Sequence, residues 1–147
     1  MIIISLEQLN SLSKKVADYI KAKDCIFLTG DIGVGKTTFT RYLINYLQKK
    51  EGSKITEVLS PTFNLLYEYD LKNFKIMHYD LYRLKNKKEL DTLGIFQENE
   101  NAIKIIEWPS LIKIPILDKL EIHLDYAKRE NERKLKLLGT GKWKSFE

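Results

Sequence analysis

Short apolar segments recur along the chain, and most of them are too short for anything but β-strands. Residues 2–4, 25–29, 55–59 and 103–107 are mainly apolar or β-branched, whereas residues 120–125 and 134–137 alternate apolar with polar positions. The first pattern is typical of buried strands, and alternation is typical of strands with one face in solvent. Residues 65–69 and 74–80 are also β-rich, and the four residues between them predict an antiparallel hairpin.

Three other stretches have the 3.6-residue periodicity of amphipathic helices. Ser5 and Gln8 form a capping-box pattern that begins the first, which we expect to end near residues 21–23. The second follows residue 37, and Gly52 can supply its left-handed cap. The third spans residues 86–93 and ends at Gly94. The chain therefore combines helices with strands, some of which follow one another directly, as in the hairpin of residues 65–80.

The segment between strand 25–29 and the second helix contains the motif with the clearest chemistry. Residues 30–37 read Gly-Asp-Ile-Gly-Val-Gly-Lys-Thr and match G-x-x-x-x-G-K-[ST] in full. Glycines permit the positive φ angles that direct successive N–H groups at one point, and the helix N-terminus adds partial positive charge there. We therefore expect a phosphate cradle that involves Asp31, Ile32, Gly33, Val34, Gly35, Lys36, Thr37 and Thr38.

The expected ligand of this loop is a nucleoside triphosphate, and we expect ATP rather than a guanine nucleotide. Lys36 would reach the β- and γ-phosphates, and the Thr37 hydroxyl is placed to bind a Mg²⁺ that the phosphates share. The arrangement of strand, loop and helix predicts an α/β fold. We expect a single P-loop NTPase-like domain over residues 1–147, with a mixed central β-sheet flanked by helices.

Two acidic residues occur where predicted strands end. Asp80 ends strand 74–80 and Glu107 ends strand 103–107. Ligands of open α/β sheets bind beyond the carboxyl ends of the strands, and carboxylates there can hold Mg²⁺ or its waters. For Asp80 the alternative is a solvated carboxylate at a strand end. His78 shares a face with Asp80, and we assign it a hydrogen bond in the core rather than a catalytic role.

Two further segments border the expected site. Ser60-Pro61-Thr62 follows the predicted strand 55–59 and offers two hydroxyls that could reach the triphosphate, although an ordinary turn is the alternative. Trp108 precedes Pro109, so its ring either fills the core or lies over a ligand.

Composition restricts the remaining possibilities. The 147 residues contain no apolar stretch of 18 and no basic start of a signal peptide, so we expect a cytoplasmic protein with no membrane contact. The single cysteine, Cys25, is expected in the core. The net charge of +5 comes mainly from dispersed lysines, which favours a solvated surface over a nucleic-acid-binding one. Residues 139–147 lack periodicity and are expected to form a flexible tail.

Five motifs in order along the chain resemble those of the bacterial TsaE family, formerly YjeE. They are Gly30-Asp31-Ile32-Gly33-Val34-Gly35-Lys36-Thr37-Thr38, Ser60-Pro61-Thr62-Phe63, His78-Tyr79-Asp80-Leu81-Tyr82-Arg83, Glu89-Leu90 with Gly94-Ile95, and Ile106-Glu107-Trp108-Pro109. The resemblance implies a small P-loop ATPase that works with two proteins, TsaB and TsaD. Together they make threonylcarbamoyladenosine at position 37 of tRNAs that read codons beginning with A. It implies that this chain meets tRNA only through the complex.

By matching position, the resemblance also implies roles for individual residues. Lys36 and Thr37 would bind phosphate and Mg²⁺, Asp80 and Glu107 would serve the metal and the attacking water, and Trp108 would lie near the nucleotide. Ser60 and Thr62 would belong to a switch-like loop that senses the γ-phosphate. The catalytic group would thus be Lys36, Asp80 and Glu107, and the metal ligands would come from Thr37, Asp80 and Glu107.

Two alternatives to an accessory ATPase remain open. A small-molecule P-loop kinase shares the loop and the size, but the four dispersed arginines, Arg41, Arg83, Arg129 and Arg133, show no lid segment. A nucleotide-dependent binding switch would bind ATP without hydrolysing it. Because no arginine is evident at the right place within the loop region, we expect hydrolysis by the isolated chain to be weak and to be stimulated by partners.

Overall fold

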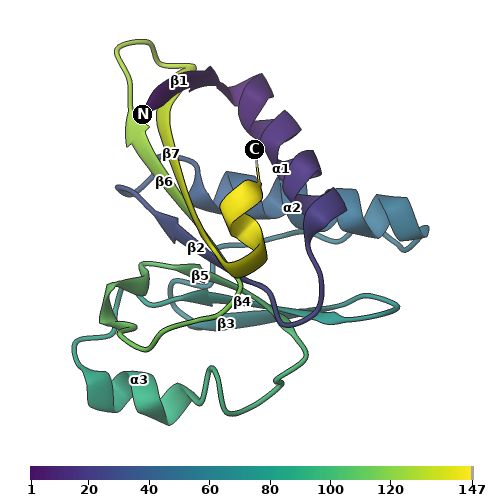
Figure 1. Ribbon diagram of the computed structural model, residues 1–147, viewed down its shortest axis with the longest axis vertical. Coiled ribbons are helices and arrows are strands. Elements are labelled where there is room, and N and C mark those ends of the chain that lie inside the picture. The colour runs from purple at the N-terminus through teal and green to yellow at the C-terminus, as the bar shows by residue number, and fades with distance from the viewer. Residues whose placement is uncertain (147) are drawn as a thin grey trace.

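The computed structural model describes residues 1–146 and is built around one seven-stranded sheet (Figure 1). Its strands are β1 (Ile2–Ser5), β2 (Cys25–Thr29), β3 (Leu66–Asp70), β4 (Lys75–Asp80), β5 (Ile103–Glu107), β6 (Lys119–Tyr126) and β7 (Glu132–Thr140). The helices are α1 (Leu6–Tyr19), α2 (Lys36–Glu51) and α3 (Lys87–Leu93), with short 3₁₀ helices η1 (Pro109–Leu111) and η2 (Gly141–Ser145).

The sheet is mixed, as the hairpin pattern predicts. Its strand order is β1-β7-β6-β2-β5-β4-β3. The four inner strands β6, β2, β5 and β4 run parallel, whereas β3 pairs antiparallel with β4, and β7 pairs antiparallel with β6 and β1. The carboxyl ends of β2, β5 and β4 therefore meet at one edge of the sheet, where the expected site lies. The α/β fold is confirmed.

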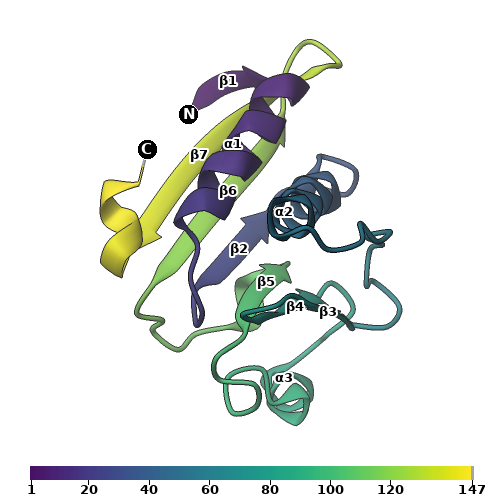
Figure 2. The same ribbon diagram turned by 90° about the vertical axis from the view of Figure 1, so that its right-hand side faces the viewer.

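Successive residues of the buried strands serve two separate cores. In β2, Ile26 and Leu28 pack toward α1 and α2, whereas Cys25 and Phe27 pack on the other face. That second core also holds Leu90 and Leu93 of α3. Figures 1 and 2 show α1 and α2 together against one face of the sheet, with α3 well away from them. A strand buried on both faces accounts for the nearly uninterrupted apolar sequence of β2.

The helix boundaries follow from local capping. The Ser5 side chain accepts a hydrogen bond from the Gln8 N–H at 3.1 Å, and Gln8 Oε1 accepts one from the Ser5 N–H at 2.8 Å. Gly52 and Gly94 both adopt left-handed conformations at the ends of α2 and α3, which is the capping role expected of them.

No helix within residues 1–146 has the length and apolar character that a membrane-crossing segment requires.

The prediction of a strand at residues 55–59 is wrong. This segment is not paired with any strand, and side chains of α2 bind its backbone instead. Asn45 Nδ2 donates to the Thr56 carbonyl at 3.0 Å, and the Thr56 N–H donates to Gln48 Oε1 at 3.2 Å. Val58 is buried, so the segment is anchored along α2 without joining the sheet.

The prediction of a flexible tail is also wrong for residues 139–146. Strand β7 continues through Thr140, and η2 follows it. Trp143 of η2 is only 1% exposed and packs edge-on against Tyr19 of α1, with 4.8 Å between ring centroids. The segment is ordered because it buries a large aromatic side chain, a contact that periodicity within the segment cannot reveal. Residue 147 lies outside the described part of the chain.

Candidate functional site

Residues 30–35 form a tight loop between β2 and α2. Gly30 has a φ of +140°, and a Cβ there would collide with the carbonyl oxygen of Leu124 in the neighbouring strand β6. Gly33 has a φ of +80°, a conformation that residues with a side chain adopt at a cost. The glycines therefore permit both the close approach to the sheet and the turn that brings the loop to the start of α2.

Lys36, the first residue of α2, folds back over this loop. Its Nζ donates hydrogen bonds to the carbonyl oxygens of Gly30 and Asp31, the latter at 3.0 Å. It also lies 4.3 Å from the centroid of the Trp108 ring. Burial lowers the pKa of the Lys36 ammonium, and the nearby carboxylates of Glu107 and Asp80 oppose that shift. The lysine is thus positioned at the mouth of the loop with carboxylates close by.

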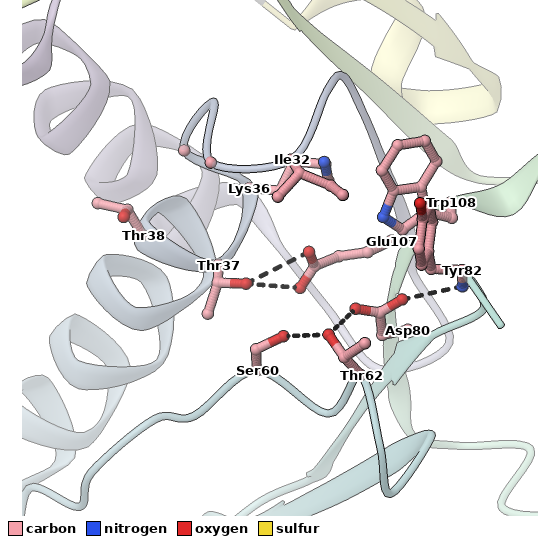
Figure 3. Close-up of a pocket in the computed structure, with 12 residues that line it drawn as sticks. Ile32, Lys36, Thr37, Thr38, Ser60, Thr62, Asp80, Tyr82, Glu107 and Trp108 are labelled. Carbon is pink, nitrogen blue, oxygen red and sulfur yellow. Dashed lines mark hydrogen bonds between the residues drawn. The ribbon is translucent and has the colours of Figure 1, made fainter.

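The two acidic strand ends come together as the sequence predicts. Asp80 and Glu107 are paired in the register of the parallel strands β4 and β5, and both are buried. The Thr37 hydroxyl donates toward the two carboxylate oxygens of Glu107, at 3.1 and 3.3 Å. Neither residue is therefore a solvated strand-end carboxylate: both are held next to the phosphate loop (Figure 3).

The segment that contains Ser60 and Thr62 reaches the site through Asp80. The Thr62 hydroxyl donates to Asp80 Oδ2 at 2.8 Å, and Ser60 Oγ lies 2.8 Å from the Thr62 hydroxyl. The other oxygen, Oδ1, accepts from the Tyr82 N–H at 2.9 Å. Figure 3 shows this chain of contacts running from Ser60 to Tyr82. Both oxygens of Asp80 are therefore held by hydrogen bonds.

Trp108 also borders the site, and its backbone is strained. It has a φ of +57° and a ψ of +58°, which is unfavourable for a residue with a side chain. Its ring packs against Tyr82, with 4.8 Å between ring centroids. The indole packs against the edge of the second core and also faces Lys36 at the cavity, so the arrangement favours the interpretation in which Trp108 lies over a ligand.

These residues enclose one cavity of about 230 Å³. Of the sequence-predicted residues, all but two line it: Ile32, Gly33, Gly35, Lys36, Thr37, Thr38, Ser60, Thr62, Asp80, Glu107 and Trp108. The two exceptions are Asp31, whose side chain is exposed, and Val34, which is fully buried in the core beneath the loop. Val34 anchors the loop, and Asp31 contributes its carbonyl oxygen to Lys36.

Sequence reasoning missed Tyr82 as a residue of this cavity, and it gave no partner for the hydrogen bond expected of His78. Tyr82 lines the cavity, and His78, fully buried beneath it, places Nε2 2.6 Å from Glu107 Oε2. The period of two in β4 places His78 on the same face as Asp80, and the structure shows the buried hydrogen bond that was expected of it. Its partner belongs to another strand, and only the folded sheet reveals that contact.

The donor set fits a magnesium ion that is shared with phosphates. Mg²⁺ prefers oxygen ligands and is commonly held by one or two carboxylates together with substrate phosphates and water. The Thr37 hydroxyl and the carboxylates of Glu107 and Asp80 supply such oxygens within one cavity. Residues 1–146 contain no cluster of three or more His, Cys, Asp or Glu side chains that would hold a metal alone. The site therefore suits a metal that arrives with a phosphorylated ligand.

Comparisons with known proteins identify relatives of this chain. The family described as "Threonylcarbamoyl adenosine biosynthesis protein TsaE" matches residues 3–135. Similar proteins named "tRNA threonylcarbamoyladenosine biosynthesis protein TsaE" occur in Rickettsia conorii, at 38% identity over 89% of this chain and 72% of the relative, and in Aquifex aeolicus, at 33% identity over 93% of both. The Bacillus subtilis protein of that name is 30% identical over 94% of this chain and 84% of its own.

A solved structure supports the same fold. The crystal structure of YdiB from Bacillus subtilis superposes with a TM-score of 0.68, covering 95% of this chain and 86% of that chain at 24% identity. At that identity the likeness bears on the fold alone. The family match and the relatives cover most of the chain, including every residue of the cavity. The chain therefore belongs to the TsaE family of threonylcarbamoyl adenosine biosynthesis proteins.

Proposed function

We propose that this protein binds ATP with Mg²⁺ and hydrolyses it in the biosynthesis of threonylcarbamoyladenosine in tRNA. The observation that carries the proposal is the convergence of Lys36 and Thr37 of the phosphate loop with Asp80 and Glu107 from two adjacent strand ends. A loop that only turned the chain would not need two buried carboxylates opposite its lysine. The names of its relatives, which refer to tRNA threonylcarbamoyladenosine biosynthesis, support the assignment to tRNA modification.

Phosphate recognition falls to the loop and to Lys36. The N–H groups of the loop and of the first turn of α2 offer donors and partial positive charge to phosphate oxygens. The Lys36 ammonium now binds two loop carbonyls, and it can exchange them for the β- and γ-phosphates without moving far. Thr37, Asp80 and Glu107 would hold Mg²⁺, which when bound neutralises charge on the phosphates.

Hydrolysis requires that a water molecule attack the γ-phosphorus while the bond to the ADP oxygen breaks, which yields ADP and phosphate. No covalent protein intermediate is needed, so the protein's contribution is positioning and charge neutralisation. Glu107 is held from two sides, by Thr37 and His78, and is suited to orient that water. Asp80 is held by Thr62, so the segment that contains Ser60 and Thr62 can respond to events at the phosphates.

The isolated protein should hydrolyse ATP slowly, because none of the residues lining the described cavity is an arginine. Arginines that act in phosphoryl transfer are supplied within the chain or by a partner, and they raise the rate by about 10³- to 10⁵-fold. We propose that TsaB and TsaD, the partners implied by the family resemblance, complete the site in the cytoplasm. In this proposal tRNA is met only through the complex.

Phosphate release from ATP tests the proposal. Wild type, Lys36→Ala and Lys49→Ala are compared, each alone and with TsaB and TsaD. Lys49 is an exposed lysine at the far end of α2 and serves as the matched control. We expect release that the partners stimulate in wild type and Lys49→Ala and that Lys36→Ala abolishes.

The same assay separates the proposal from two others. ATP binding without release under any condition would indicate a nucleotide-dependent binding switch. Release that requires a phosphate acceptor would indicate a small-molecule kinase. Turnover by the chain alone at the rate of the complex would contradict the role given to the partners.

A further inference from the structure

Two side chains at the closed end of the β6–β7 hairpin hold the phosphate loop from its outer side. The Tyr126 hydroxyl donates to the Ile32 carbonyl oxygen at 2.7 Å, and Arg133 Nε donates to the Val34 carbonyl oxygen at 2.7 Å. We propose that Tyr126 and Arg133 are positioning residues that direct the phosphate-binding N–H groups of the loop into the cavity. This inference rests on the proposed function, since it assigns a role in nucleotide binding.

Peptide geometry connects these carbonyls to the cavity. Residues 1–146 contain no cis peptide bond. In a planar trans peptide the C=O of one residue and the N–H of the next point in opposite directions. A carbonyl of Ile32 that is held outward therefore turns the N–H of Gly33 inward, and a carbonyl of Val34 held outward does the same for Gly35. Gly33 and Gly35 both line the cavity, whereas Tyr126 and Arg133 do not.

The loop needs this restraint because its glycines restrict the backbone conformation very little. Gly33 and Gly35 have φ angles of +80° and +126°, and glycine moves among such conformations more freely than any other residue. A flexible cradle must be ordered each time it binds phosphate, which weakens binding, whereas a cradle fixed in advance avoids that loss. The hydrogen bonds to the Ile32 and Val34 carbonyls therefore hold the N–H groups of Gly33 and Gly35 toward the cavity.

The hairpin contacts complement those of Lys36. Lys36 binds the carbonyl oxygens of Gly30 and Asp31, whereas the hairpin binds those of Ile32 and Val34. Lys36 is also the side chain that phosphate would attract, so its loop contacts compete with the ligand. The contacts from Tyr126 and Arg133 lie on the other side of the loop and can persist when the ligand binds.

The hairpin is itself built to hold the two side chains in place. Tyr126 and Arg133 are register partners across β6 and β7, and the guanidinium lies 4.9 Å from the centroid of the tyrosine ring. Arg133 Nη1 donates to the carbonyl oxygens of Glu130 and Glu132, at 2.7 Å each. A Cβ at residue 33 would lie 3.0 Å from the Tyr126 hydroxyl, so glycine there also gives the hydroxyl its close approach.

The test uses the full chain and three variants, Tyr126→Phe, Arg133→Lys and the double variant. Phenylalanine removes only the hydroxyl. Lysine keeps the charge, but its three donors lie on one nitrogen and cannot replace the separate contacts of Arg133 Nε and Nη1. The matched controls are Tyr46→Phe, whose hydroxyl contacts Asp18, and Arg129→Lys, at an exposed position of the same hairpin. Amide relaxation by NMR reports the order of Gly33 and Gly35 without ligand, and calorimetry gives the affinity for ADP with Mg²⁺.

We expect the Gly33 and Gly35 amides to become more mobile in the double variant and ADP to bind about tenfold more weakly, since two hydrogen bonds are lost. Both controls should match wild type. A merely structural hairpin role would lower the unfolding temperature and disturb residues 127–131 without moving the two glycine amides. That result, or ADP affinity within twofold of the Arg129→Lys control, would overturn the inference.

The two readouts keep this inference distinct from the proposed function. If wild type binds neither ADP nor ATP, the proposed function fails whatever the variants show. If wild type binds ADP and the glycine amides keep their order in the double variant, the proposed function stands and the positioning role fails. Mobile glycine amides together with weakened ADP binding support both.

Discussion

His78 and Glu107 form a buried contact beneath the cavity, with Nε2 of the histidine 2.6 Å from Oε2 of the glutamate. Both side chains are at most 3% exposed. A carboxylate oxygen can only accept in such a pair, so Nε2 carries the proton. Nδ1 has no hydrogen-bond partner in the described structure. His78 therefore uses its ring to bind Glu107 and no other described polar group. This hydrogen bond fixes the orientation of the Glu107 carboxylate, which also accepts from Thr37.

The two amide substitutions at His78 separate positioning from packing. Gln places an amide near the position of Nε2, whereas Asn places one near Nδ1, which binds nothing. We expect His78→Asn to lower partner-stimulated phosphate release by about tenfold or more, as with other residues that orient a metal-site carboxylate, and His78→Gln to retain most of it. Release is measured at saturating ATP, with circular dichroism as the check on folding. Equal losses in the two variants would argue against a positioning role.

Thr37 offers a test of the expected magnesium site. Its hydroxyl lies 3.1 Å from Glu107 Oε2, so its oxygen and that carboxylate are placed to share one ion. Phosphate release should stop when a chelator removes Mg²⁺ and return when Mg²⁺ is added. Thr37→Ser keeps the hydroxyl and should behave as wild type, whereas Thr37→Ala should require about tenfold more Mg²⁺ for half-maximal release. An unchanged Mg²⁺ requirement in Thr37→Ala would remove Thr37 from the metal ligands.

The parts of the site that sequence could predict are those whose geometry is local. The glycines, Lys36 and the start of α2 follow one another directly, so their arrangement follows from backbone preferences. Asp80 and Glu107 were predictable because each ends a strand, and parallel strands bring their ends together. Their side-chain partners were not predictable, because each lies far away in sequence: His78 reaches Glu107 only after β4 and β5 are paired, and Thr62 reaches Asp80 from the segment before β3.

The two errors in the fold have a common physical cause. The β-rich sequence of residues 55–59 suits an extended backbone, but it does not decide whether that backbone binds a strand or side chains. Here Asn45 and Gln48 of α2 bind the Thr56 backbone in place of a neighbouring strand. Residues 139–146 have no periodicity, yet Trp143 is buried against Tyr19, which lies at the other end of the chain. In both cases a contact distant in sequence decided the local structure.

Removal of the Trp143 side chain should therefore destabilise the protein. The ring is 1% exposed and contacts both Tyr19 and Phe146. Trp143→Ala is expected to lower the free energy of unfolding by about 3–5 kcal/mol, measured by urea denaturation. Trp143→Phe keeps most of the packing and removes a buried indole N–H that has no hydrogen-bond partner, so its cost should stay below about 1.5 kcal/mol. Equal unfolding free energies for Trp143→Ala and wild type would restore the interpretation of a flexible tail.

Cys25 provides a prediction about pH. Burial within β2 raises the pKa of its thiol from the ordinary value of 9.0 to about 12, because the thiolate would lose its hydration. Since the folded protein holds the proton more tightly than the unfolded chain, this contribution to stability is complete below about pH 9 and is lost between pH 9 and 12. Cys25→Ala removes it, so the unfolding free energy of that variant should fall less steeply than that of wild type over this range. A thiol reagent should correspondingly modify Cys25 in urea and leave the folded protein unmodified near neutral pH. Rapid modification of the folded protein would show that the strand opens at this position or that the thiol is not buried.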